Sequence, residues 1–473
     1  MALLASTEPP PPLPRGGTAA RGMTLLVAVA LTLALNSPGM AVGTGDITQL
    51  SGSSGLDGCV SKDGTEGGTQ TTDVVCETEP LLSNPTVVTV SPDNKHVYVG
   101  QAAGGKVLVF VRNKSTKGGA SFGSLDVPAG STTVSGVHRD ILVTPDNKHV
   151  YITAGANLFM FSRNAKTGAL TALTPAKIQN LPTPEGLATP KDGKHVYLAA
   201  RGLKGVIVFA RNKKTGLLTE SSCVAVDPAP SDGCTPGVGM KGATDVAVSN
   251  DGKSVYVTAD VSNAVAMFTR DKKTGELTQA PSPDGCWSQT GQDGSTGPTD
   301  VCRDGRGLLG ANGIAIPTDG KFVYVSSTDS NAIALFSRDT KTGDLTQFPD
   351  TEGCVSEAGN DGNAQAGVGQ CTAADIGGLI KVQKVVISDN GNNLYTSARG
   401  NTTASHKGAI SAFTRDEELG TLTQLSCTGP DAACASAGVA LHQLQGLAVA
   451  KDGKNVYVTA PGDDAVAAFE VDK

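Results

Sequence analysis

One sequence unit recurs seven times along the chain, and this repetition constrains the fold more than any other feature. Each copy carries a variant of the string SPDNKHVYVG, which begins at Ser91 in the first copy. A phenylalanine follows about a dozen residues later, usually with an arginine two residues beyond it, a Thr-Gly turn and a Leu-Thr pair, as in FTRDKKTGELTQ. All seven tyrosines of the chain occupy one place in this unit, at Tyr98, Tyr151, Tyr197, Tyr256, Tyr324, Tyr395 and Tyr457. Such internal periodicity indicates a repeat architecture.

Each copy is predicted to form four short strands. Apolar and polar residues alternate with period two, β-branched residues are frequent, and Asp-Gly or Asp-Asn turns separate the segments, whereas no segment keeps a helical period over ten residues. The 59 glycines and 25 prolines among 473 residues fit a chain rich in turns. Seven four-stranded units of this kind predict an all-β, seven-bladed β-propeller.

The two ends of the repeat region predict how the ring closes. The last copy stops at AVAAFEVDK and lacks the Leu-Thr strand that forms the outer edge of the other copies. Residues 45–50, GDITQL, match that missing strand (GELTQ, GDLTQF, GTLTQL). We therefore expect the N-terminal strand to complete the seventh blade, so that residues 44–473 make a single propeller domain.

Residues 1–43 read as a leader and signal peptide. The apolar stretch from Thr24 to Leu35 is twelve residues long, whereas a helix that crosses a bilayer needs roughly 20 apolar residues. Small residues near Ala41 and Gly43 suit a cleavage site. The sequence therefore predicts no membrane span, and a secreted, extracellular or periplasmic protein.

Ten cysteines occur as five sequential pairs, each in the connection between the outer strand of one copy and the inner strand of the next. The expected disulfides are Cys59–Cys76, Cys223–Cys234, Cys286–Cys302, Cys354–Cys371 and Cys427–Cys434. An even cysteine count behind a secretory signal favours disulfides. No CxxC motif is present and His does not cluster with Cys, so zinc is the weaker alternative.

Charge and composition restrict the possible partners. The formal net charge is −7, and the Lys and Arg residues are scattered, which argues against nucleic acid or an anionic membrane as a partner. We expect no cofactor, no bound metal and a monomer. Calcium at loop carboxylates stays open as an alternative, with Asp57, Asp63, Asp284, Asp293 and Asp361 as the candidate residues.

The irregular loops should share one face of the propeller. The Asp-Gly and Thr-Gly turns belong to one face, and the second-to-third-strand loops and Cys loops belong to the other, where binding is more common. Counting back seven residues from the turn Asp (Asn390 in the sixth copy) gives the start of each inner strand. All seven residues found there are polar: Thr86, Arg139, Glu185, Thr244, Asn312, Gln383 and Gln445.

Charged residues near this ring point to a pocket. His138 precedes Arg139, and counting four residues past the repeat tyrosine reaches Arg201, Asp260 and Arg399. A carboxylate, a histidine and several arginines could therefore converge above the central channel. The alternative is a hydrated channel in which the polar ring serves only backbone groups through water. His96, His149 and His195 are expected to be surface strand residues.

The VYVT/VYVS core, the Asp-Gly-Lys turn and the FxRD..TGxLT tail resemble those of the seven-bladed lactonase-type propellers. This group includes 6-phosphogluconolactonase-like enzymes, carboxymuconate cyclases and the wider YVTN-repeat proteins. The resemblance covers residues 45–473 and implies a His, Arg and Glu group that acts on a cyclic ester. His138, Arg139 and Glu185 are the closest matches for catalysis, with Glu185 or His138 as the base. Arg201, Arg399, Asn312, Gln383 and Gln445 are the expected substrate-binding residues.

Two functions follow from this resemblance. The first is a secreted enzyme that hydrolyses or forms a cyclic ester, with a small lactone or carboxylate as its ligand. The second is a non-catalytic extracellular propeller that recognises a protein or a glycan, because propellers host enzymes and binding platforms alike. A phosphorylated sugar substrate is not expected, since a secretion signal and five disulfide-braced loops do not suit a cytoplasmic sugar-phosphate enzyme.

Overall fold

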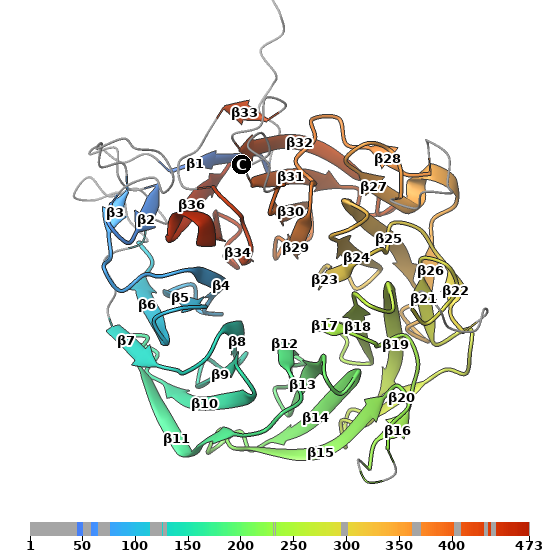
Figure 1. The fold of residues 1–473 in the computed structure, drawn as a ribbon, viewed down its shortest axis with the longest axis horizontal. Coiled ribbons are helices and arrows are strands. Elements are labelled where there is room, and N and C mark those ends of the chain that lie inside the picture. The colour runs from blue at the N-terminus through green and yellow to red at the C-terminus, as the bar shows by residue number, and fades with distance from the viewer. Residues whose placement is uncertain are drawn as a thin grey trace, which may run out of the picture. The chain divides into compact units, whose positions relative to one another are not determined.

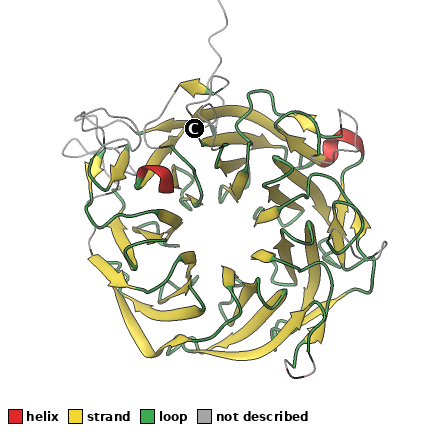
Figure 2. Ribbon diagram, in the orientation of Figure 1, coloured by secondary structure: helices red, strands yellow, loops and turns green. Residues whose placement is uncertain are grey.

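The computed structural model describes residues 45–50, 58–64, 76–113, 125, 130–229, 231, 233–294, 301–361, 370–401, 408–429, 434–436 and 441–472. All of them lie in the compact unit Val42–Lys473. The leader and signal peptide predicted for residues 1–43 lie outside the described residues. The described chain is all-β, with only two short 3₁₀ helices, η3 (Asp350–Gly353) and η4 (Pro461–Asp463), and its sheets are arranged as a seven-bladed propeller (Figures 1 and 2).

Each blade runs from an inner strand at the centre to an outer strand at the rim (Figure 1). Blade 1 comprises β4 (Pro85–Val90), β5 (His96–Gln101), β6 (Lys106–Val111) and β7 (Gly130–Thr133). Blade 2 comprises β8 (His138–Val143), β9 (His149–Ala154), β10 (Asn157–Arg163) and β11 (Leu170–Ile178). Blade 3 comprises β12 (Pro184–Ala188), β13 (His195–Ala200), β14 (Gly205–Arg211), β15 (Leu218–Ala225) and β16 (Thr235–Pro236).

Blades 4 to 6 follow the same order. Blade 4 comprises β17 (Ala243–Val248), β18 (Ser254–Ala259), β19 (Ala264–Arg270), β20 (Leu277–Gln279), β21 (Cys286–Ser288) and β22 (Arg303–Asp304). Blade 5 comprises β23 (Ala311–Ala315), β24 (Phe322–Ser327), β25 (Ala332–Arg338), β26 (Leu345–Gln347), β27 (Cys354–Ser356) and β28 (Thr372–Ala373). Blade 6 comprises β29 (Val382–Ile387), β30 (Asn393–Ala398), β31 (Ala409–Arg415), β32 (Leu422–Gly429) and β33 (Ala435–Ser436).

Blade 7 joins the two ends of the described chain, as the sequence predicted. Its strands are β34 (Leu447–Val449), β35 (Asn455–Ala460) and β36 (Ala465–Val471), followed by β1 (Ile47–Gln49), β2 (Cys59–Ser61) and β3 (Glu77–Thr78). Strand β1 pairs antiparallel with β36, and Ile47 lies opposite Val471. Buried Ile47 and Leu50 pack into two different core clusters. The ring is therefore closed by main-chain hydrogen bonds and by apolar packing.

The prediction of four strands per blade is correct for blades 1 and 2 and too low for the five blades that carry a cysteine pair. In those blades a two-residue strand, such as β16 or β22, adds in parallel to the rim of the sheet. The second cysteine of each pair directly precedes this added strand. All five predicted disulfides are present: Cys59–Cys76, Cys223–Cys234, Cys286–Cys302, Cys354–Cys371 and Cys427–Cys434.

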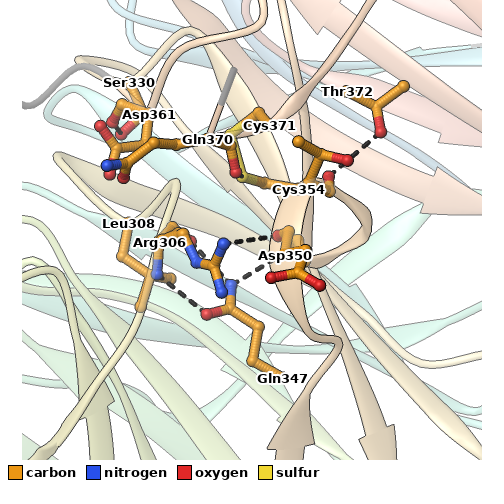
Figure 3. Close-up of a disulfide and its surroundings, with 12 residues drawn as sticks. Arg306, Leu308, Ser330, Gln347, Asp350, Cys354, Asp361, Gln370, Cys371 and Thr372 are labelled. Atoms are coloured by element: carbon orange, nitrogen blue, oxygen red, sulfur yellow. Dashed lines mark hydrogen bonds between the residues drawn. A yellow bond between two sulfur atoms is a disulfide. The ribbon is translucent and has the colours of Figure 1, made fainter. Parts of the chain in front are cut away.

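A glutamine of the outer strand also braces the cysteine loop. In blade 5 the Gln347 side chain accepts a hydrogen bond from Arg306 N at 2.9 Å and donates to Arg306 O at 2.8 Å and to Gly353 O at 3.0 Å, beside the Cys354–Cys371 disulfide (Figure 3). Gln279 makes the corresponding bonds to Val238 and Gly285 in blade 4. The Leu-Thr-Gln motif therefore fixes the loops at the rim.

The repeat tyrosine and arginine clamp neighbouring blades together. Between blades 1 and 2, Tyr98 Oη donates to Gly168 O at 2.8 Å and accepts from Arg163 Nε at 2.7 Å, while the Arg163 guanidinium pairs with the turn residue Asp93 at 3.0 Å. All seven tyrosines are fully buried. The Thr-Gly turn, the Arg and the turn Asp are thus parts of one interblade contact.

The expectation that His96, His149 and His195 are surface residues is wrong. These three histidines are only 1%, 4% and 4% exposed. Each Nδ1 accepts a hydrogen bond from the clamp arginine of the next blade, at 2.6–2.8 Å. Because each arginine belongs to the next copy of the repeat, the sequence pattern within one copy could not predict that it buries the histidine.

Candidate functional site

The polar residue at the start of each inner strand is set apart by a β-bulge. In blades 1 to 6 the register between the first two strands shifts across Thr86, Arg139, Glu185–Gly186, Thr244, Asn312 and Gln383. A bulged residue is left out of the regular ladder, and bulges often re-aim a side chain beside a functional site. In blade 7, Gln445 precedes β34 and its N donates to Thr459 O at 3.1 Å.

These seven residues line one central cavity of about 230 Å³, together with Val137, His138, Gly186, Arg201, Asp260 and Lys384. The convergence of the polar ring, which the repeat register predicted, is therefore present in the structure. The inner strands around it belong to all seven blades, as Figure 1 shows for β4, β8, β12, β17, β23, β29 and β34.

Hydroxyl groups on the second strands hold the bulges in place. Thr153 Oγ1 donates to Glu185 O at 2.8 Å, and Ser397 Oγ donates to Gln445 O at 2.8 Å. In each case the hydroxyl belongs to one blade and the carbonyl of the ring residue to the next. Thr258 and Ser326 make the same bond to Asn312 and Gln383. The ring residues are thus positioned by contacts between blades, which favours a preformed cavity.

A carboxylate and two arginines occupy one wall of the cavity. Glu185 Oε2 lies 3.9 Å from Arg139 Nε, and the Glu185 side chain is 15% exposed, against 49% for Arg139. Burial raises the pKa of Glu185, and the positive charges of Arg139, Arg201 and Lys384 oppose this shift only in part. Glu185 therefore has the properties of a general base that operates nearer neutral pH than an ordinary carboxylate.

Lys384 crosses the channel. It starts from β29 in blade 6, and its Nζ lies 2.7 Å from Asp245 Oδ2 of blade 4. Burial alone would lower the pKa of Lys384, but Asp245 and Asp140 outweigh burial and raise it. Since Lys384 lines the cavity, this ion pair spans the channel and contributes a cation to the cavity wall.

Asp140 belongs to the same group of charges. Its two carboxylate oxygens accept hydrogen bonds from Ile141 N at 2.8 Å and from Leu187 N at 2.7 Å. Burial raises the pKa of Asp140 to about 6, aided by the negative charge of Asp245 and opposed by Lys384. In the sequence, a charged residue directly follows the ring residue in three copies: Asp140, Asp245 and Lys384. This regularity did not predict that Lys384 and Asp245 pair across the channel.

His138 does not have the geometry expected of a catalytic base. The ring is fully buried, its Nδ1 accepts from Gln101 N at 2.7 Å, and its Nε2 lies 2.7 Å from Val134 O. Because Nδ1 accepts from an amide, Nε2 carries the proton and donates to the carbonyl. Burial lowers the pKa of His138. Both nitrogens are engaged by backbone, so the histidine supports the Arg139 bulge and offers no free base.

The remaining expected residues divide into two groups. Asn312, Gln383 and Gln445 reach the cavity, and Arg201 does so with its Nη1 2.7 Å from Asp260 Oδ2. Arg399 is exposed and is not among the cavity residues. Thr86 and Thr244 of the predicted polar ring also line the cavity, as do Asp260 and Lys384.

The described residues hold no group of three or more His, Cys, Asp or Glu side chains suited to a metal ion. Of the carboxylates considered for calcium, Asp284 pairs with Arg303, Asp293 with Lys241, and Asp361 accepts from Gln289. Asp57 lies outside the described part of the chain. Within that part, no helix is both long and apolar enough to cross a bilayer.

Comparison with known proteins agrees with the fold. Residues 61–283 match the family model described as lactonase, 7-bladed beta-propeller. The 6-phosphogluconolactonase of Bacillus subtilis strain 168 is 24% identical over 280 residues, which cover 57% of this chain and 70% of that protein. Together with the seven blades, these matches show that the chain is similar to the lactonase-type β-propellers.

A solved structure from Bacteroides uniformis gives the same fold. A candidate 6-phosphogluconolactonase from Bacteroides uniformis aligns with a TM-score of 0.50 and 17% identity, over 72% of this chain and 84% of its own. Another candidate, from Bacteroides fragilis, is 24% identical over 54% of this chain, with a TM-score of 0.40. In that comparison the chain spans 66% of its relative, just under two thirds.

Proposed function

We propose that this protein is a secreted lactonase that hydrolyses, or in reverse forms, a cyclic ester in the central cavity. The observation that carries the proposal is the placement of Glu185, a carboxylate with a raised pKa, at the cavity wall 3.9 Å from Arg139. A base and a cation on one wall are two groups that accelerate ester hydrolysis. The five disulfides are consistent with an oxidising compartment.

In this proposal Glu185 accepts a proton from a water molecule as the water oxygen attacks the lactone carbonyl carbon. The carbonyl oxygen gains negative charge, which Arg139 stabilises from beside the carboxylate. When the ring C–O bond breaks, protonated Glu185 returns the proton to the departing alkoxide and leaves a hydroxy acid. Atoms and charge balance without a cofactor, and the reverse sequence closes the ring.

Asn312, Gln383 and Gln445 supply neutral hydrogen-bonding groups on the blades away from Glu185. We expect them to orient the lactone ring. The His138 imidazole contributes indirectly, because its bonds to Gln101 N and Val134 O fix the backbone just before Arg139.

A panel of five- and six-membered lactones, assayed against the non-enzymatic rate, tests this function. We expect turnover in the wild type, a loss of about 10²–10⁴-fold in kcat for Glu185→Gln, and a smaller loss for Arg139→Ala. Absence of turnover on every lactone by a folded protein would refute the proposal and favour the non-catalytic binding propeller.

A further inference from the structure

Each cation of the central cavity has a carboxylate of the protein within 4 Å. Arg201 Nη1 lies 2.7 Å from Asp260 Oδ2, and Lys384 Nζ lies 2.7 Å from Asp245 Oδ2. Arg139 has Glu185 at 3.9 Å. Every Lys or Arg among the cavity residues therefore has an acidic neighbour within ion-pair distance.

We infer that Asp260 is a specificity-determining residue that fits the cavity for an uncharged, hydroxyl-bearing lactone and against one that carries a phosphate or additional carboxylates. The inference rests on the proposed lactonase function and narrows its substrate class. A phosphate group carries a charge of about −1.5 to −2 near pH 7. Proteins hold such groups with arginines whose N–H donors are free to form paired bonds.

Asp260 restricts such binding at Arg201, because it occupies the Nη1 donor and neutralises the charge. The two side chains come from the β13–β14 and β18–β19 loops of adjacent blades, and they are 37% and 30% exposed. Asp260 is also held from behind, because Gly242 approaches so closely that a Cβ there would lie 2.3 Å from Asp260 Oδ1. A phosphate that binds Arg201 through Nη1 would have to displace a carboxylate that the packing keeps in place.

The rest of the cavity supports the same conclusion. Asp245 neutralises Lys384, and Asp140 adds a further acidic group to the channel. Acidic groups thus outnumber the three cations once these two are included. Five ring residues, by contrast, present neutral hydroxyl or amide groups. Such groups suit hydroxyls on a sugar-like ring, and they give little compensation for a second or third negative charge on the ligand.

The test compares glucono-δ-lactone with its 6-phosphate ester, with kcat and KM determined separately. We expect wild-type kcat/KM to be at least tenfold higher for the unphosphorylated lactone. Asp260→Asn keeps the shape of the side chain and releases Arg201, so kcat/KM for the phosphate ester should rise about tenfold, mainly through KM. Asp329→Asn is the matched control, because Asp329 pairs with Lys381 at 2.8 Å in the corresponding loop of blade 5, outside the cavity.

The outcomes separate this inference from the proposed function. A wild type that hydrolyses both lactones but prefers the phosphate ester overturns the inference and leaves the lactonase function intact. If neither lactone is hydrolysed, calorimetric titration with inorganic phosphate still decides: binding by Asp260→Asn and not by the wild type supports the role of Asp260, and equal behaviour overturns it. Should Asp260→Asn fail to fold, Asp245→Asn releases Lys384 and carries the same expectation.

Discussion

Replacing Arg338 by Met should open one interblade clamp without removing its apolar packing. The Arg338 side chain is 1% exposed. Its Nε donates to Tyr256 Oη at 2.7 Å, its Nη1 to Gly320 O at 3.0 Å, and its Nη2 to Ser254 Oγ at 2.9 Å and to Asp251 Oδ2 at 3.1 Å. The substitution therefore leaves several buried acceptors without their donor.

The expected loss of stability follows from the burial of the Arg338–Asp251 ion pair. Removing one member of a buried ion pair destabilises a protein by about 3–5 kcal/mol. Asp251 is 31% exposed and can regain water, so we expect a loss of about 2–4 kcal/mol in the free energy of unfolding at pH 7. Guanidinium chloride unfolding, followed by tyrosine fluorescence and circular dichroism, measures this change.

The loss should also depend on pH. Partial burial alone would raise the pKa of Asp251, but hydrogen bonds from Ser249 and Lys253 and the charge of Arg338 outweigh it and lower the pKa. A lowered native pKa stabilises the fold above the pKa of the unfolded state, about 3.9, and this stabilisation disappears as Asp251 protonates at lower pH. The difference between Arg338→Met and wild type should therefore shrink below about pH 4.

The chain contains a natural control for this experiment. At the seam between blades 6 and 7, Val471 stands at the arginine place and Asn390 at the turn Asp place, so cation and anion are both missing. Asp251→Asn combined with Arg338→Met copies that arrangement and should lose less stability than Arg338→Met alone. An Arg338→Met protein as stable as wild type, or one with an equal loss at pH 3 and pH 7, would refute the clamp as the source of stability.

Two other structural predictions concern ring closure and the braced loops. The Ile47 side chain of β1 is buried in the blade 7 core, so Ile47→Ala should lower the free energy of unfolding by about 2–4 kcal/mol. Deletion of residues 45–50 should lower the melting temperature further, and an unchanged melting temperature would contradict closure through this strand. Replacing Cys354 and Cys371 by serine opens a loop with a sequence separation of 17 and should lower the free energy of unfolding by about 3 kcal/mol. Because the pair lies outside the cavity, kcat on a lactone should stay unchanged; lost activity in a folded variant would show that the rim loop reaches the site.

The register of the repeats was sufficient to predict the ring closure and the ring of seven polar residues. Both follow from comparing copies position by position, since equivalent residues of a propeller occupy equivalent places around the axis. The bulge that separates Glu185 and Arg139 from the ladder was not predictable, because the alternation of residues alone does not mark it.

Contacts between copies account for what the sequence did not reveal. The hydrogen bond that Arg270 donates to His195 joins two neighbouring blades, and the Lys384–Asp245 pair joins blades that are not neighbours. Arg399 shows the opposite case, because counting from the repeat tyrosine gave the correct loop while its side chain is exposed outside the cavity. Where a long side chain points depends on its neighbours in the closed ring, so it could not be predicted from the sequence of a single copy.

The pH dependence of kcat/KM tests the central claim, that Glu185 is the base of this cavity, most directly. Burial raises the pKa of Glu185, and the base must be ionised to accept a proton. Activity should therefore rise with pH along a limb that lies above the ordinary pKa of a glutamate, about 4.3. This limb should be absent from the residual activity of Glu185→Gln. An identical acid limb in Glu185→Gln and wild type would contradict the account.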